Sequence, residues 1–538
     1  MKAKKVLAML MASAMIMGTA VTAFASTQTY KDAARVVGLE NDNLTVTAYQ
    51  IIKYNQAGYY EEVVEDTITK TGTTADGRDI LTPNASDIEE LAAMVVAPET
   101  SKNFTSVRFS ADETTEETIG DYKYDNLAPG AWLVIVSGSD QYLYNPAILS
   151  VNVTADGTEY GELNYDADEW NTPAYPKRSE PTITKTAEKE NESDTDIVGV
   201  QYGDILKFTV TADIPDYASD VTDIETYEIS DTLDGLSLVK DTEHPVEVTV
   251  AGVTDVSAVA DIIAGEITDG EESFSAVLSD DDDAVEFLLN NGGKKIVVTY
   301  YAEVTSDAKI NVDELNNTAT LDYSTRDKVV SKEAETNHYT FGFDTGFNGT
   351  ITTEDKTGEF IKIDSSGSVA YEEYGSGEVT VTSPLEGAVF ELRINNASED
   401  AEVFGIFTTD ADGRLEVNGL DSDVTYYLVE TQAPKGYTVN STPISVEIDA
   451  TYVDGKLTGY DVIFDGSAVT HYTYEEGTTT IVNTEGTPSN PYGFKNTSLS
   501  ELPSTGGIGT TIFTIGGCVI MVTAAGLYFA TRKKEHNA

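Results

Sequence analysis

The chain has 538 residues, too many for one domain of ordinary size, which predicts three or four domains. Its 92 acidic and 33 basic residues give a net charge of −59, which excludes nucleic acid and anionic membranes as binding partners. The single cysteine, Cys518, lies in a long apolar run, so the rest of the chain can form neither a disulfide nor a cysteine-based metal site.

The N-terminus has the pattern of a secretory signal peptide. Three lysines fall within the first five residues, an apolar run follows, and Ala23-Phe24-Ala25 is a small-x-small cleavage site. We therefore expect a signal peptide over residues 1–25 and an exported mature chain that begins at Ser26.

Between the two ends, short alternating apolar runs are separated by Gly, Asp, Asn and Pro, which is typical of β-sandwiches. Runs of this kind, in chain order, are Leu44–Tyr49, Ala131–Val136, Leu206–Val210, Lys295–Tyr301 and Tyr426–Glu430. Short helices are expected within loops, at Ala85–Val95 and Val256–Ala264. The predicted fold class is all-β, with tandem immunoglobulin-like β-sandwich domains.

Two composition changes suggest domain boundaries. The Pro-containing segment Asn171–Pro181 interrupts strand pairing, because proline lacks an N–H donor, and Phe341–Gly358 is rich in glycine. The predicted organisation is a signal peptide (1–25), an N-terminal domain (26–174), a linker (175–180), a middle domain (181–343), a C-terminal domain (356–485), a polar tether (486–501) and a C-terminal targeting segment (502–538).

Ordinary catalytic motifs are missing from the sequence. None of the four histidines lies in an HExxH arrangement, and there is neither a P-loop nor a dinucleotide-binding glycine fingerprint. We interpret the acidic run Asp280–Asp283 as a solvated loop, which leaves calcium binding open, and Asp410–Gly413 as a turn. We therefore expect no metal, no cofactor and no enzymatic activity on other molecules.

The C-terminus contains Leu502-Pro503-Ser504-Thr505-Gly506, then an apolar stretch, Ile508–Thr531, and a basic tail. As a helix, the apolar stretch would span about 36 Å, enough to cross a bilayer. This order resembles the cell-wall sorting signal of Gram-positive surface proteins. The resemblance implies a transmembrane sorting helix and a sortase that cuts between Thr505 and Gly506, holding the Thr505 carbonyl as a thioester.

Two further segments resemble the major (backbone) pilins of Gram-positive sortase-assembled pili. Trp170-Asn171-Thr172-Pro173-Ala174-Tyr175-Pro176-Lys177 is similar to the pilin motif of that family, although Thr172 and Ala174 stand where the family often has Val. The segment Tyr426–Tyr437 closely resembles the family's E-box. The resemblance implies that the Lys177 amine attacks the sortase thioester of the next subunit.

The resemblance also implies intramolecular isopeptide bonds in collagen-adhesin-type sandwich domains. It points to one trio of lysine, acid and asparagine in the middle domain, Lys185, Asp231 and Asn317, and to one in the C-terminal domain, Lys362, Glu430 and Asn483. Period-two alternation places five of the six in phase with apolar neighbours, as expected for inward side chains. The face of Lys362 is undetermined, because Ile361 and Ile363 lie on the opposite side. No trio is predicted in the N-terminal domain.

The leading hypothesis is a structural shaft subunit of a covalent pilus, anchored in the cell wall and displayed on the cell surface. Its expected partners are pilus-class and housekeeping sortases, identical subunits, ancillary pilins and peptidoglycan. A monomeric wall-anchored adhesin would share the sorting signal and the isopeptide bonds without needing Lys177. A tip or base pilin would carry an extra adhesive domain, and a wall-bound hydrolase is disfavoured by the missing catalytic motifs.

Overall fold

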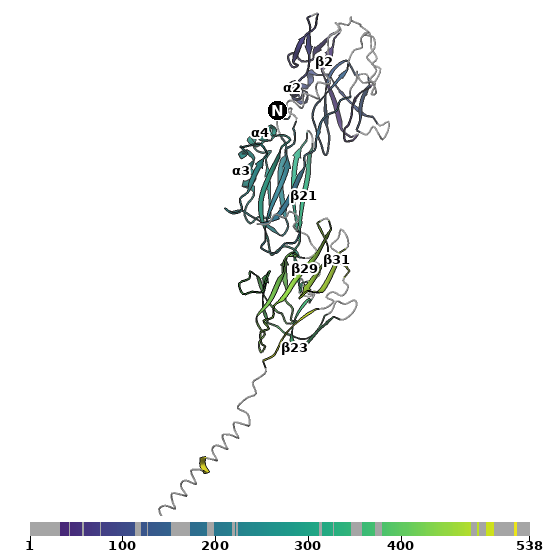
Figure 1. The fold of residues 1–538 in the computed structure, drawn as a ribbon. Coiled ribbons are helices and arrows are strands. Elements are labelled where there is room, and N and C mark those ends of the chain that lie inside the picture. Colours follow the sequence, from purple (N-terminus) through teal and green to yellow (C-terminus); the bar gives the residue numbers. More distant parts are fainter. Residues whose placement is uncertain are drawn as a thin grey trace, which may run out of the picture. The chain divides into compact units, whose positions relative to one another are not determined.

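The structure is a computed structural model, drawn in Figure 1. It describes residues 33–41, 43–55, 59–75, 77–112, 120–125, 127–151, 173–190, 198–217, 221, 224–310, 315–325, 328–345, 358–371, 379–453, 455–474, 481–483, 491–499 and 521–523. The chain divides into two compact units, residues 1–308 with 314–338, and residues 309–313 with 339–538.

The N-terminal part of the first unit is built on a five-stranded antiparallel sheet. Its strands are β11 (Ala147–Val151), β9 (Gly130–Ser137), β2 (Thr45–Tyr54) and β3 (Tyr60–Glu62), with β6 (Ser106–Arg108) also paired to β2. The smaller sheets are β1 (Ala33–Val36) with β8 (Tyr122–Asp125) and β7 (Ser110–Ala111), β4 (Lys70–Thr73) with β5 (Asp79–Leu81), and β10 (Leu143–Tyr144) with β12 (Arg178–Ser179).

Two sheets form the middle domain, in the same unit. The first contains β13 (Ile183–Lys189), β14 (Ile205–Asp213), β19 (Lys295–Val304) and β16 (Leu236–Val239), with β17 (Glu247–Val250) also paired to β19. The second contains β18 (Ser273–Val277), β15 (Tyr227–Leu233), β20 (Leu315–Ser324) and β21 (Val329–His338). Alternate residues of these strands enter one apolar core, as the period-two patterns predict.

The second unit holds a seven-stranded sheet and a three-stranded sheet. The first runs β26 (Val403–Thr408), β25 (Val389–Ile394), β28 (Tyr426–Gln432), β29 (Ile444–Val453), β30 (Lys456–Phe464), β31 (Ser467–Tyr474) and β32 (Ile481–Asn483). The second runs β24 (Val379–Pro384), β23 (Phe360–Tyr371) and β33 (Tyr492–Asn496). The pairing of β23 with β33 is parallel, which joins the beginning and the end of this domain.

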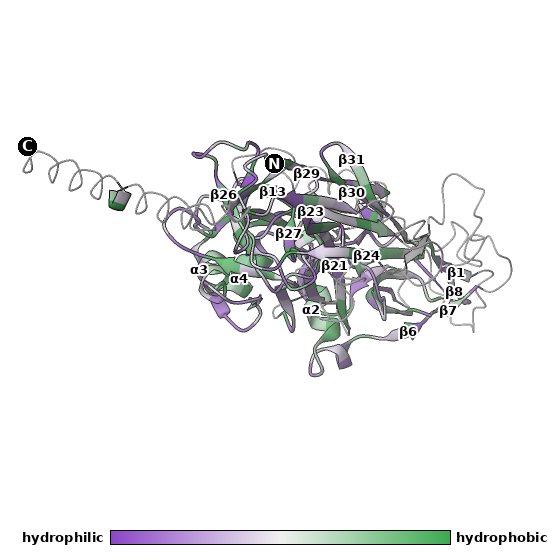
Figure 2. Cartoon of the chain, turned by 90° about the horizontal axis from the view of Figure 1, so that it is seen from below, coloured by the Kyte–Doolittle hydropathy of each residue, from purple (hydrophilic) through white to green (hydrophobic). Residues whose placement is uncertain are grey.

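The helices are short and lie between strands. They are α2 (Ala85–Val96), α3 (Ser257–Glu266), α4 (Asp282–Asn290) and the 3₁₀ turn η2 (Ser101–Asn103). The first two confirm the predicted helices, and Figure 2 shows hydrophobic residues along both. Asn84 and Asp87 form a capping box that satisfies free N–H groups at the start of α2.

The acidic run Asp280–Asp283 has a structural role at the start of α4. The Asp281 side chain accepts hydrogen bonds from the backbone N–H groups of Asp283 and Ala284, so it is the N-cap of the helix. Asp410 closes a turn, as predicted, by accepting from the backbone N–H groups of Asp412 and Arg414. Within the part of the chain that the structure describes, no group of three or more His, Cys, Asp or Glu side chains could hold a metal ion.

Two predicted boundaries are wrong. Strand β22 (Phe341–Phe343) pairs with β27 (Val417–Leu420) and its phenylalanines enter the core of the second unit, so the middle domain ends before residue 343. The predicted tether contains β33, whose Phe494 is buried in the same core. Both segments are short, and their burial depends on partners far away in the sequence.

The predicted signal peptide, residues 1–25, and the pentapeptide at 502–506 lie outside the described residues. Only 521–523 of the apolar C-terminal stretch are described, and these three residues are helical. Among the described residues, no helix has the length and apolar character needed to cross a membrane.

Candidate functional site: two buried lysine clusters and one exposed lysine

The predicted trio of the middle domain comes together in its core. Lys185 is on β13, Asp231 on β15 and Asn317 on β20, and all three side chains are buried. The Lys185 Nζ lies 2.7 Å from each carboxylate oxygen of Asp231 and also contacts Asn317 Oδ1. Three residues separated by up to 132 positions thus meet at one amine.

Strand geometry explains this meeting. On β13, Ile183, Lys185 and Ala187 are buried while the residues between them are exposed, so the lysine points inward. On the facing sheet, β15 and β20 are hydrogen-bonded neighbours, with Asp231 opposite Ala319 and Leu233 opposite Asn317. Asp231 and Asn317 are therefore diagonal neighbours on the same inner face.

Burial shifts the pKa values of both members of this pair in the direction that favours their neutral forms. Burial lowers the pKa of Lys185 to about 8, although the nearby Asp231 opposes the shift. Burial likewise raises the pKa of Asp231, against the effect of Lys185. The rings of Phe208 and Tyr300 lie 5.1 and 5.9 Å from Nζ and exclude water from it. A neutral amine is a nucleophile, and a protonated acid can polarise a carbonyl.

The second unit contains a cluster of the same composition. Lys362 is on β23, Glu430 on β28 and Asn496 on β33, and all three are buried. The Lys362 Nζ lies 3.1 Å from Glu430 Oε1 and contacts Asn496 Oδ1. Asn496 Nδ2 donates to Glu430 Oε1 at 2.8 Å and Oε2 at 3.1 Å. The pKa of Lys362 is lowered to about 8, chiefly by burial.

The asparagine of this cluster corrects the sequence prediction. We predicted Asn483, whose side chain lies outside the described residues, but the structure places Asn496 beside Lys362. In the parallel pairing of β23 and β33, Lys362 is opposite Phe494, so Asn496 follows two residues later on the same face. The sequence does contain a signal for this strand, the alternation of Tyr492, Phe494 and Asn496. It was missed because these residues were assigned to the polar tether.

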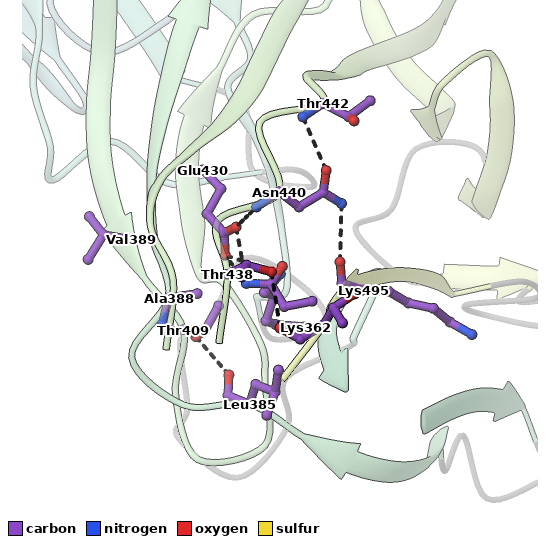
Figure 3. Close-up of polar contacts among 12 residues, drawn as sticks. Lys362, Leu385, Ala388, Val389, Thr409, Glu430, Thr438, Asn440, Thr442 and Lys495 are labelled. Carbon is purple, nitrogen blue, oxygen red and sulfur yellow. Dashed lines mark hydrogen bonds and ion pairs between the residues drawn. The ribbon is translucent and has the colours of Figure 1, made fainter. Parts of the chain in front are cut away.

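Figure 3 shows how a loop after β28 holds the Glu430 carboxylate. The backbone N–H of Asn440 donates to Glu430 Oε2 at 2.6 Å. The Asn440 side chain accepts from the Thr442 backbone N–H at 3.2 Å and donates to the Lys495 carbonyl at 3.1 Å. The loop therefore connects the acid on β28 with the strand that carries Asn496.

Lys177 is exposed to solvent, whereas Lys185, eight positions later in the chain, is buried. Its side chain is 71% exposed, and its Nζ lies 3.8 Å from Asp216 Oδ2. The backbone is fixed nonetheless, because the Lys177 carbonyl accepts from the Asn145 N–H at 2.8 Å and Pro176 is buried. The upstream residues 170–172 of the predicted motif lie outside the described residues. The backbone at Lys177 is thus anchored, and its amine is open to solvent.

The N-terminal domain has a buried acid with different partners. Asp112 is paired with Arg35 at 2.5 Å and with Lys123 at 2.7 Å. Asp112 thus accepts charge-assisted hydrogen bonds from two cations. In the described part of this domain we identify no lysine, acid and asparagine trio.

Comparisons with known proteins address the fold and the C-terminal signal. A family described as a prealbumin-like fold domain matches residues 376–461, and one described as the LPXTG cell wall anchor motif matches residues 495–536. The second match confirms the predicted anchor motif. The first covers the centre of the seven-stranded sheet, including Glu430.

Among curated proteins, the chain is 24% identical over 480 residues to the trypsin-resistant surface T6 protein of Streptococcus pyogenes serotype M6, which covers 77% of this chain and 81% of that protein. Among solved structures, it is similar to the T6 backbone pilin of serotype M6 Streptococcus pyogenes, described as a modular three-domain structure. The TM-score is 0.52 and the identity 19%, over 88% of this chain and 100% of that one. The predicted all-β fold of tandem domains is confirmed.

Proposed function

We propose that this chain is the shaft subunit of a covalent pilus that sortase enzymes assemble on a Gram-positive cell surface. The observation that carries the proposal is the exposed amine of Lys177, on an anchored backbone, in a chain that also has an LPXTG anchor motif. The likeness to a surface protein and to a backbone pilin, over most of the chain, supports the same function.

In the proposed assembly, a pilus-class sortase cleaves the bond between Thr505 and Gly506 and holds the Thr505 carbonyl as a thioester. The neutral Lys177 amine of a second subunit attacks that carbonyl, an amide forms, and the sortase thiol is released. The last subunit is passed by a housekeeping sortase to peptidoglycan. Identical subunits and ancillary pilins are therefore the partners, and no cofactor takes part.

Each buried cluster is proposed to form one internal isopeptide bond. The Lys185 amine attacks the Asn317 carboxamide with Asp231 as the acid, and Lys362 attacks Asn496 with Glu430 as the acid. One ammonia leaves for each amide formed. Folding holds amine and carboxamide in contact, which replaces a bimolecular step by an effectively unimolecular one. The chain acts only on itself, so it is not an enzyme in the usual sense.

The test of the assembly proposal is Lys177→Arg in cells that display the protein. Arginine keeps the positive charge but stays protonated and cannot act as the nucleophile. We expect the ladder of high-mass species in cell-wall extracts to disappear, while single subunits remain wall-anchored. Lys102→Arg is the matched control, because its side chain is 68% exposed and lies outside the linker. A normal ladder in the Lys177 variant would contradict the proposal and favour the alternative function, a monomeric wall-anchored adhesin.

A further inference from the structure

The two clusters differ at the carboxamide nitrogen, which is the atom that leaves as ammonia in the proposed reaction. In the second unit, Asn496 Nδ2 donates to both oxygens of Glu430, so the acid can pass a proton to it directly. In the middle domain, Asn317 Nδ2 makes no hydrogen bond to any described residue. Asp231 therefore has no direct contact through which to protonate the leaving nitrogen.

Tyr300 is a further side chain that contacts Asp231 in the middle domain. It comes from β19 and is fully buried, with its ring stacked on Phe208 at 5.3 Å and edge-on to Phe274 at 5.4 Å. Its hydroxyl donates to Asp231 Oδ2 at 2.6 Å. The Asn317 side chain also acts on this phenol, because it lowers the Tyr300 pKa against the larger effect of burial.

In the second unit, the hydrogen bond to the acid comes from a backbone group instead of a side chain. There, the group that donates to the acid is the backbone N–H of Asn440, at 2.6 Å from Glu430 Oε2. A backbone amide can orient a carboxyl group but cannot accept and release a proton under these conditions. A phenol can do both, because its oxygen has a proton to give and lone pairs to receive one.

We propose that Tyr300 relays a proton from Asp231 to the leaving nitrogen of Asn317 when the middle-domain bond forms. The inference rests on the proposed Lys185–Asn317 bond. The Lys185 amine attacks Asn317 Cγ and gives one proton to Asp231 Oδ1. When Asp231 is protonated on Oδ2, the Tyr300 hydroxyl proton rotates away from Oδ2 towards Asn317 Nδ2, and the hydrogen bond between the two side chains reverses. Asp231 then passes its proton from Oδ2 to the Tyr300 oxygen, and Tyr300 passes its own proton to Nδ2. The Cγ–Nδ2 bond breaks, ammonia leaves, and Asp231 and Tyr300 each end with the proton count they began with.

Burial suits Tyr300 to this role. Burial, with a smaller contribution from Asp231, raises the pKa of Tyr300 well above its ordinary value, so the phenol stays neutral in the core. A neutral relay moves a proton without creating a second buried charge, which would be costly in this apolar surrounding.

The test compares Tyr300→Phe with wild type in the full chain, by mass spectrometry of protease digests. The protein is prepared in the cold and then warmed. The amount of the cross-linked peptide containing Lys185 and Asn317 is measured at intervals after warming. We expect closure to slow by about 10²–10⁴-fold, the usual contribution of a positioned proton-transfer group. The peptide containing Lys362 and Asn496 serves as an internal reference and should close as in wild type.

Tyr227→Phe is the matched control. Tyr227 is fully buried in the same core, and its hydroxyl donates to the Asp213 backbone carbonyl at 3.2 Å, away from the cluster. Its loss should leave closure unchanged. Introducing 3-fluorotyrosine in place of Tyr300 should restore closure and shift its pH dependence, because that phenol is more acidic while its packing is nearly the same.

Three outcomes separate the possible failures. Closure of the Tyr300→Phe variant at the wild-type rate would overturn the relay. Absence of the Lys185–Asn317 peptide from wild type would instead overturn the proposed bond. The third measurement uses a Lys185→Met background, where no bond can form. If Tyr300→Phe lowers the unfolding temperature there much more than Tyr227→Phe does, the slow closure is due to disturbed packing. That result would also overturn the relay.

Discussion

Replacing Asn496 by alanine should remove the proposed cross-link of the second unit and leave that of the middle domain. The intact mass of purified residues 26–501 should then be about 17 Da below the sequence mass, against about 34 Da for wild type, one ammonia per bond. Asn483→Ala should keep the full deficit of about 34 Da, because Asn496 is the asparagine that contacts Lys362.

The effect on stability follows from the size of the closed loop. Lys362 and Asn496 are 134 positions apart. A cross-link that closes a loop of this length lowers the entropy of the unfolded chain by an amount worth about 5 kcal/mol at room temperature, by analogy with disulfides. Asn496→Ala should therefore reduce the free energy of unfolding of the second unit by about this amount, measured by denaturant titration.

Two results would refute this reasoning. One is a full mass deficit in Asn496→Ala together with a reduced deficit in Asn483→Ala, which would restore the original sequence prediction. The other is a reduced deficit in Asn496→Ala without any change in the denaturant midpoint, which would show that the bond does not constrain the unfolded chain.

Glu430→Ala should leave the second unit folded with its lysine and asparagine unlinked, because the acid activates the carboxamide without supplying an atom to the product; recovery of the full mass deficit would show that another group does so. His244 tests pH dependence. Burial lowers the pKa of His244, but Asp241 and then Glu190 raise it by more, so its net pKa is raised. The stabilisation that it provides is complete below the unfolded pKa of about 6.5 and is lost as the pH rises through the folded pKa. The melting temperature of wild type should exceed that of His244→Gln at acid pH, and the gap should close toward alkaline pH; a gap that widens with pH would contradict this sign.

Alternation in the sequence predicted the strand-rich fold and supported most of the buried cluster residues, which the family resemblance had pointed to. Asp231, Asn317 and Glu430 each stand in phase with apolar neighbours, and each is buried. The face of Lys362 could not be predicted, because Phe360, Ile361 and Ile363 are also buried. The alternation fails to identify an inner face wherever a strand is covered on both sides.

The remaining errors concern partners that only the folded chain brings together. Asn496 is one of several asparagines near the end of the chain, and its role depends on the parallel pairing of β33 with a strand more than one hundred residues earlier. Tyr300 lies in the alternating run of β19, where an aromatic residue predicts only a core position. Its contact with Asp231 arises because the two sheets of the middle domain face each other.

The parallel pairing of β23 with β33 has a mechanical consequence in a fibre. If tension enters a subunit at Lys177 and leaves at Thr505, the stretch of chain before Lys177 carries no load. Among the described residues of that stretch we identify no cross-linking trio. In the second unit, tension would act on the start of β23 and the end of β33. Parallel strands pulled from opposite ends are loaded in shear, and the amide between Lys362 and Asn496 would carry the force across them. The 133 residues between those two positions (134 apart) would then stay slack while the pilus is under tension.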